Sequence, residues 1–200
     1  MAEMDVPGAY QRMELFRVPP GFRKRSAVIV QLWWIVQGSF FALSPQIMYG
    51  WRVWLLRLFG ARIGKGVIIR PTVRTTYPWN IQIGDYCHIG DNSELYSLGE
   101  IEIGDRVVVS QRSYLCTGSH DHTSTAFDIF AKKIVIESEA WLATDVFVAP
   151  GVSIGRGAVI GARSSVFRDI PPGVICRGSP AEIVGPRVMK NGVADALQRQ

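Results

Sequence analysis

Residues 136–171 read IESEAW LATDVF VAPGVS IGRGAV IGARSS VFRDIP, six consecutive hexads with one pattern. Each hexad begins with an aliphatic residue, and a small or β-branched residue follows four positions later. A period of six fits neither a helix, with about 3.6 residues per turn, nor a strand that alternates its faces. It predicts a triangular coil in which each hexad forms one short strand and one turn. The alternative, an ordinary β-sandwich, would show a period of two.

The same pattern extends upstream, and three hexads would complete one coil. Successive coils would stack as parallel strands about 4.8 Å apart, with the aliphatic side chains inside. Small residues after the aliphatic position, such as Gly155 and Gly161, are expected to ease the turn. The upstream aliphatic positions are Ile63, Ile69, Ile83, Ile89, Leu95, Ile103, Val109 and Leu115.

The phase of the repeat divides the chain. It shifts near residues 77–80 and 98–102, which predicts small insertions there, and residues 121–133 interrupt it completely. Because Phe127, Ile129 and Phe130 are apolar, this interruption is expected to contact a partner surface rather than form a disordered tether. We expect an N-terminal helical segment at 1–60, a β-helix domain at 61–187 with an external loop at 121–133, and a C-terminal tail at 188–200.

The N-terminal segment has three interpretations. Residues 27–43 contain no charge, but this stretch is shorter than the roughly 20 residues of a membrane-spanning helix. Trp51, Trp54, Leu55 and Leu58 follow at helical spacing. Four tryptophans of this segment alternate with Arg52 and Arg57, a mixture that suits either a cap on the open end of the β-helix or a surface facing lipid head groups. Packing on the β-helix is the first reading, surface contact with a membrane the second, and spanning the last.

Composition narrows the class of partner. The net charge is +5 and the pI is near 9.3, but no run of five Lys or Arg occurs, so a nucleic-acid-binding tail is not expected. Three cysteines, widely spaced and without a CxxC pair, argue against a disulfide framework and a cysteine zinc site. Acidic residues precede the first apolar stretch, unlike a secretory signal. A cytoplasmic location is the expectation.

At this point a family resemblance is evident. The repeat resembles the [LIV]-[GA]-x-x-[STAV]-x hexapeptide of the acyltransferases, over about residues 60–187. The segment GARSSVFRDIPPG, residues 161–173, is similar to the closing segment of maltose, galactoside and nodulation-type O-acetyltransferases. The segments LLRLFGARIG, residues 55–64, and LCTGSHD, residues 115–121, look most like the branch of colanic acid biosynthesis acetyltransferases.

The resemblance implies a fold and an activity. The fold would be mainly β, a left-handed parallel β-helix of hexapeptide repeats with N-terminal helices. The activity would be transfer of an acetyl group from acetyl-CoA to a sugar hydroxyl in exopolysaccharide biosynthesis. The resemblance also implies a homotrimer, no metal, no nucleic acid, and a small-molecule or lipid-linked sugar acceptor. Peripheral contact with the inner face of the membrane would suit such an acceptor.

A general base is needed for acetyl transfer, and imidazole suits that role because its pKa near 6.5 leaves it largely neutral at pH 7. Of His88, His120 and His122, His120 stands where the family has its catalytic histidine, at the mouth of the external loop. The common family spelling has histidine directly after Thr-Gly, whereas Ser119 intervenes here, so His122 remains an alternative. Cys116 is expected to be structural, and its rival role is a nucleophile.

Further site residues follow from the resemblance. We expect the substrate to meet Glu94, Asp121, Asp128 and Trp141. Coenzyme A is expected in a groove along one edge, where small residues admit the pantetheine arm and cations meet its phosphates. The expected coenzyme A residues are Ala143, Thr144, Ala162, Phe167, Arg168 and Arg187. Two basic positions of the galactoside and maltose enzymes are Glu182 and Gly185 here, so Arg168, Arg177 or Arg187 would have to compensate.

Two rival functions remain on the same fold. A γ-type carbonic anhydrase would bind zinc through three histidines, but that family has two of them five positions apart, whereas His120 and His122 are two apart. A scaffold without catalysis would need neither His120 nor affinity for coenzyme A.

Overall fold

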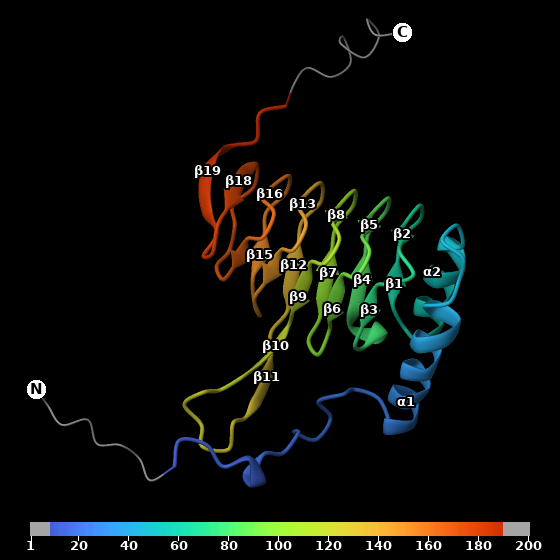
Figure 1. Cartoon of the computed structure of the whole chain (residues 1–200), viewed down its shortest axis with the longest axis vertical. Coiled ribbons are helices and arrows are strands. Elements are labelled where there is room, and N and C mark those ends of the chain that lie inside the picture. The colour runs from blue at the N-terminus through green and yellow to red at the C-terminus, as the bar shows by residue number, and fades with distance from the viewer. Residues whose placement is uncertain (1–8, 190–200) are drawn as a thin grey trace, which may run out of the picture.

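The computed structural model describes residues 9–189, and its body is a parallel β-helix whose short strands stack into three sheets (Figure 1). Sheet 1 contains β1 (Arg62–Ile63), β4 (Ile81–Ile83), β7 (Ile101–Ile103), β12 (Ile134–Ile136) and β15 (Ser153–Ile154). Sheet 2 contains β2 (Ile68–Ile69), β5 (His88–Ile89), β8 (Val108–Val109), β13 (Trp141–Leu142), β16 (Val159–Ile160), β18 (Val174–Arg177) and β19 (Glu182–Pro186). Sheet 3 contains β3 (Arg74–Thr75), β6 (Glu94–Tyr96), β9 (Tyr114–Cys116), β14 (Phe147–Val148) and β17 (Ser165–Val166).

The interior is a set of stacked aliphatic side chains, as the hexads predict. In sheet 1, Ile63, Ile83, Ile103, Ile136 and Ile154 are aligned by the parallel strand register, and all are buried. Burying one such side chain stabilises the fold by roughly 1.5–3 kcal/mol. The predicted phase shifts also occur: a short helical turn, η3 (Pro78–Asn80), separates β3 from β4, and residues 97–100 separate β6 from β7. The hexapeptide β-helix is therefore confirmed.

The role assigned to the small residue after each aliphatic position was wrong. The left-handed turn conformation occurs three residues after the aliphatic residue, and Arg106 and Arg112 adopt it there with φ near +55° and +59°. The small residue is required by close stacking instead. A Cβ on Gly104 would lie 2.6 Å from the backbone nitrogen of Ser138 in the next coil, and one on Gly90 would lie 2.5 Å from that of Gln111.

Helices close the first coil of the β-helix (Figure 1). They are α1 (Ala27–Val36), the π-helical turn η2 (Gln37–Phe41) and α2 (Tyr49–Leu58), and we call residues 27–58 the helical cap. A short 3-10 turn, η1 (Met13–Leu15), precedes them. In each sheet, a side chain of the cap donates a hydrogen bond to one backbone carbonyl oxygen of the first coil. The donors are Arg57 Nε to Ile63 O (3.1 Å), Arg52 Nε to Ile69 O (2.6 Å) and Trp33 Nε1 to Thr75 O (2.9 Å).

This arrangement corrects part of the lipid-facing reading of the N-terminal segment. Trp33 and Arg52 are fully buried, so neither can face lipid head groups. In α2, the side that packs on the first coil carries Leu55 and Leu56, whereas Trp54 points outward. Among the described residues, no helix combines the length and apolar character needed to cross a membrane.

Candidate functional site

The candidate site is built on a hairpin that leaves the β-helix after β9 (Figure 1). Strands β10 (Gly118–His120) and β11 (Ile129–Ala131) pair antiparallel, with His120 opposite Ile129. Thr117 holds the base of the hairpin, because its backbone carbonyl accepts from Lys132 N and its hydroxyl oxygen accepts from Gly99 N, both at 2.8 Å. The expected external loop is thus an ordered hairpin.

His120 is the last residue of β10, and Phe127 in the connecting loop fixes its ring. Its Nδ1 lies 2.8 Å from the carbonyl oxygen of Phe127, and its ring stacks on the Phe127 ring with centroids 4.2 Å apart and planes 9° apart. The Phe16 ring approaches from the N-terminal segment at 5.7 Å. Since a carbonyl oxygen only accepts, Nδ1 must carry the proton of this hydrogen bond. In the neutral imidazole, Nε2 then has a free lone pair and can accept a proton.

The two loop carboxylates expected near His120 serve the loop itself. Asp121 Oδ1 accepts from Thr123 N at 2.9 Å and from Thr123 Oγ1 at 2.6 Å, and the hydroxyl contact holds the pKa of Asp121 below its usual range. Asp128 Oδ2 accepts from Ser124 Oγ at 2.7 Å. The direct polar partner of His120 is therefore a backbone carbonyl, which no side-chain pattern in the sequence indicates.

Glu94 and Trp141 lie on the outer surfaces of different sheets. Glu94 is on β6 of sheet 3, where its Cα partner in the next coil is Tyr114. Trp141 is on β13 of sheet 2, with 45% of its surface exposed, and its Nε1 donates to Ser110 Oγ at 3.0 Å. One chain therefore does not bring these two side chains to the same face.

The expected coenzyme A residues occupy three edges of one chain. Ala143, Thr144 and Ala162 lie at the corner between sheets 2 and 3, whereas Phe167 and Arg168 follow β17 at the next corner. Thr144 Oγ1 donates to Gln111 O at 3.0 Å, and the Phe167 ring contacts the Phe147 ring at 5.8 Å. The groove along a single edge that the resemblance implies is thus not formed by one chain.

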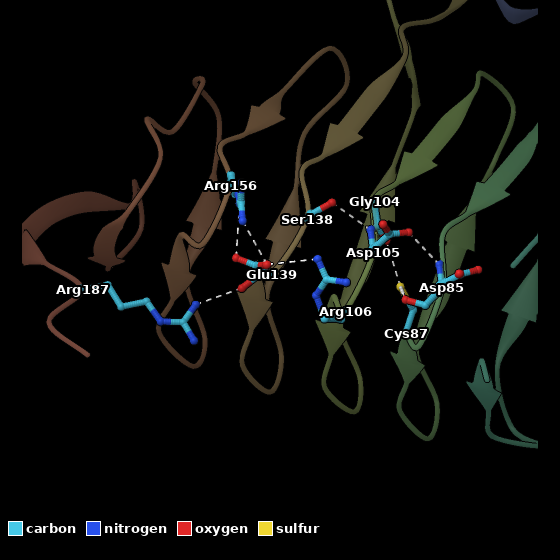
Figure 2. Close-up of polar contacts among 9 residues, drawn as sticks. All are labelled: Asp85, Cys87, Gly104, Asp105, Arg106, Ser138, Glu139, Arg156 and Arg187. Atoms are coloured by element: carbon cyan, nitrogen blue, oxygen red, sulfur yellow. Dashed lines mark hydrogen bonds and ion pairs between the residues drawn. The ribbon is translucent and has the colours of Figure 1, made fainter. Parts of the chain in front are cut away.

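Arg187 lies at the third edge (Figure 2). Its Nη1 donates to the carbonyl oxygens of Glu139 and Gly157, both at 2.9 Å, which joins the C-terminal strand to two successive coils. The Glu139 carboxylate also pairs with Arg156 and Arg106, each at 3.1 Å, and these cations, Arg156 first, lower its pKa. The contacts of Arg187 in this chain are therefore structural.

A ladder of polar side chains runs along the same edge (Figure 2). Asp105 Oδ1 accepts from Asp85 N at 2.8 Å, and Ser138 Oγ accepts from Asp105 N at 3.0 Å, so each coil satisfies a backbone amide of the coil before it. The carboxylates of Asp85 and Asp105 therefore hold neighbouring coils together. Across residues 9–189, no group of three or more His, Cys, Asp or Glu side chains is placed to hold a metal ion.

Cys116 lies four residues before His120 and close to the base of the hairpin. Its Sγ donates to Gly118 O at 3.1 Å, and burial raises the pKa of the thiol. The thiolate is the nucleophilic form of cysteine, so a raised pKa disfavours a covalent acyl-cysteine route.

Comparison with known proteins supplies the activity. No protein-family model matches the chain. A protein of Escherichia coli (strain K12) that carries the name colanic acid biosynthesis acetyltransferase WcaF is 60% identical over 178 residues, 89% of this chain and 98% of that protein. The galactoside O-acetyltransferase of the same strain is 31% identical over 133 residues, 65% of this chain and 66% of that enzyme.

The fold has solved counterparts. The crystal structure of a hexapeptide-repeat-containing acetyltransferase from Vibrio cholerae matches with a TM-score of 0.76 and 26% identity, covering 86% of this chain and all of that one. The same protein complexed with acetyl-CoA matches with a TM-score of 0.73 over 81% of this chain and 88% of that one. The second structure thus shows acetyl-CoA bound to a protein of this fold.

Proposed function

This chain belongs to the hexapeptide-repeat acetyltransferases, and on that premise we propose that it moves an acetyl group from acetyl-CoA to a sugar hydroxyl with His120 as general base. The observation that carries the proposal is the hydrogen bond between His120 Nδ1 and the carbonyl oxygen of Phe127, at 2.8 Å. It selects the tautomer with a free Nε2, which is the form a base requires.

The proposed step is direct attack. His120 Nε2 accepts the proton of the acceptor hydroxyl while the hydroxyl oxygen forms a bond to the thioester carbonyl carbon. The carbon–sulfur bond then breaks, and the leaving sulfur takes the proton back from the imidazolium. Atoms and charge balance without an acyl-enzyme, and the raised pKa of the buried Cys116 thiol supports this route over a cysteine intermediate.

The complete site is proposed to need a homotrimer. Within one chain, Trp141 lies on sheet 2, and Ala143, Thr144 and Ala162 lie at the corner between sheets 2 and 3, whereas the hairpin that holds His120 leaves from the corner after sheet 3. Association of three copies would allow one chain to supply His120 while its neighbour supplies the Trp141 face. Glu94, Asp121 and Asp128 are proposed to meet the acceptor, and Ala143, Thr144, Ala162, Phe167, Arg168 and Arg187 to contribute to the coenzyme A groove.

The acceptor is proposed to be a sugar of an exopolysaccharide repeating unit, free or lipid-linked. The likeness to the colanic acid biosynthesis protein supports this class of acceptor. Such units are built on lipid carriers, so the enzyme would work in the cytoplasm, peripheral at the inner face of the membrane.

Two measurements test the function together. Purified protein should release coenzyme A from acetyl-CoA only when a sugar acceptor is present. Mass spectrometry of surface polysaccharide should show O-acetyl groups in cells that carry the gene, and their loss in cells without it. Unchanged acetylation in the deletion strain, together with no transfer in vitro, would refute the proposal.

A further inference from the structure

The outer side of the helical cap is apolar. Its large apolar residues have between 40% and 83% of their surface exposed. Soluble monomers rarely expose contiguous apolar surface beyond a few hundred Å². The exposed residues are Val28, Leu32, Trp34, Ile35, Phe40, Leu43, Ile47, Met48, Trp54 and Leu58, and we call them the cap face.

A shallow hollow opens within the cap face between η2 and α2. Its volume is about 340 Å³, and Phe40, Leu43, Met48 and Trp51 are among its lining residues. The ring of Trp51 stacks on that of Trp54 beside this hollow, with the ring centroids 5.1 Å apart. Tryptophan is favoured at the boundary between lipid head groups and acyl chains, because its ring is apolar and its N–H is polar.

Cations surround the cap at the level of the first coil. Arg62 on sheet 1, Lys65 at the following corner and Arg74 on sheet 3 are exposed. In the second coil the strand partner of Arg62 is Gln82 and that of Arg74 is Glu94. The positive charge is therefore concentrated in the coil that adjoins the cap, and Arg23 and Arg25 add to it just before α1.

The whole sequence has the same asymmetry. Residues 1–80 contain eleven Lys or Arg and three Asp or Glu, a net charge of +8. Residues 81–200 contain eleven Lys or Arg and fourteen Asp or Glu, a net charge of −3. An apolar face bordered by cations matches an anionic bilayer, where each nearby Lys or Arg strengthens binding and the effect weakens with salt. Two such faces from two copies would repel each other.

We propose that the cap face docks on an anionic lipid bilayer, with its apolar side chains among the head groups and Arg62, Lys65 and Arg74 at the level of the phosphates. This deepens the peripheral location within the proposed function by assigning the surface that makes the contact. It concerns contact with one leaflet only, because no described helix can span the bilayer.

Docking through the cap would fix the height of the site above the membrane. The His120 hairpin leaves from β9 in the third coil, two strand spacings beyond the first, or about 10 Å at roughly 4.8 Å each. The N-terminal segment contacts both the hairpin and the β-helix before it enters α1, since Arg12 N donates to Thr125 O at 2.8 Å and Lys24 pairs with Glu100, just before β7, at 3.1 Å. A sugar carried on a membrane lipid is an acceptor that a site attached to the bilayer in this way could meet.

The test is vesicle flotation of the full chain. Vesicles of phosphatidylglycerol and phosphatidylcholine are compared with pure phosphatidylcholine, at ionic strengths of about 0.05 M and about 0.5 M. The cap variant is Phe40→Glu with Ile47→Glu, and the matched control is Ile183→Glu with Val184→Glu on β19, at the opposite end of the β-helix. We expect the unmodified protein to float with anionic vesicles at low salt and to be released at high salt.

The cap variant should lower the bound fraction at least tenfold, while the control variant binds as the unmodified protein does. Both should keep their melting temperature and their acetyl transfer to a soluble acceptor. The proposal is overturned if the unmodified protein stays unbound at low salt, if both variants lose binding equally, or if light scattering shows that the cap variant dissociates an oligomer, which would assign the face to a second copy. Because transfer is measured separately, an inactive protein that still floats would refute only the proposed function.

Discussion

Phe127 constrains the imidazole of His120 in two ways. Its carbonyl oxygen lies 2.8 Å from Nδ1 of His120, and its ring stacks on the imidazole with the centroids 4.2 Å apart. Phe127 has φ near +54°, the left-handed region that non-glycine residues seldom adopt. This turn brings its carbonyl and its ring to the same histidine. The tautomer and the orientation of the base are thus set by the hairpin turn.

Removing the ring should separate these two constraints. Phe127→Ala keeps the carbonyl but loses the stack, so the imidazole can leave its orientation more often, and we expect kcat to fall about tenfold. The affinity for coenzyme A should stay unchanged. Phe130→Ala, on the same hairpin but paired with Ser119, is the control and should change kcat less. Equal losses in both variants would mean that the stack has no specific role.

The buried guanidinium of Arg52 predicts a large loss of stability when it is replaced. Arg52 donates to the carbonyl oxygens of Ile69, Pro45 and Gln46 and to the hydroxyl of Ser44, at 2.6–3.0 Å. Arg52→Met leaves those acceptors without a donor, and we expect the free energy of unfolding to fall by about 3 kcal/mol. Urea denaturation measures it, with the exposed Arg62→Met as the control. A loss below about 1 kcal/mol would contradict the account of the cap.

Close stacking of the coils predicts opposite effects at two glycines. At Gly104 a Cβ would meet the Ser138 backbone, so Gly104→Ala should cost about 1–3 kcal/mol of unfolding free energy. At Gly50, in α2, nothing lies within 4 Å of the added Cβ. Gly50→Ala should therefore stabilise the protein by roughly 0.5–1 kcal/mol. Thermal unfolding measures both changes, and a Gly104→Ala protein as stable as the unmodified one would contradict the stacking requirement.

The sequence predicted the β-helix well, because every sixth residue is buried and those positions, such as Ile136 and Leu142, are aliphatic. From Phe127, Ile129 and Phe130 it predicted an external loop that contacts a partner surface, but it did not predict that this segment forms a hairpin. It could not indicate the partner of His120, because that partner is a backbone carbonyl brought close by a turn. The role predicted for the small residues was wrong, because the sequence does not show which coil lies against them. At Gly104 the neighbour that excludes a Cβ is Ser138, 34 positions later in the chain.

The expected coenzyme A groove illustrates a second limit. Ala143 and Phe167 were expected along one edge, yet the corner before β14 and the corner after β17 are different edges. A motif gives no information on which subunit supplies it. The helical segment shows the same limit, because helical spacing at Trp51, Trp54 and Leu58 did not reveal that the inward side of α2 carries Arg52.

Acid should weaken the protein through carboxylates that are held ionised. Arg112 donates to both oxygens of Asp145, at 2.6 and 2.8 Å, and lowers the pKa of Asp145. A carboxylate with a lowered folded-state pKa stabilises the fold above its unfolded pKa, near 3.9, and that contribution disappears as the pH falls through the folded value. Melting temperatures from pH 7 to pH 3 should thus drop more steeply below about pH 4 for the unmodified protein than for Asp145→Asn. Parallel curves would show that the pair contributes nothing.

Trimer formation is open to direct measurement. Light scattering should give a mass about three times the 22.2 kDa of one chain. Mixing His120→Ala chains with Trp141→Ala chains should restore part of the activity that each lacks, because one interface of a mixed trimer would hold both intact residues. Full activity at the mass of one chain would contradict a site shared between subunits.

The central claim is that His120, and not His122, is the general base. The decisive measurement is the turnover of acetyl transfer by His120→Ala and His122→Ala, with the affinity for coenzyme A determined on the same preparations. The account predicts that His120→Ala lowers kcat by about 10² to 10⁴ with coenzyme A affinity nearly unchanged, and that His122→Ala remains active. An active His120→Ala enzyme beside an inactive His122→Ala enzyme would contradict it.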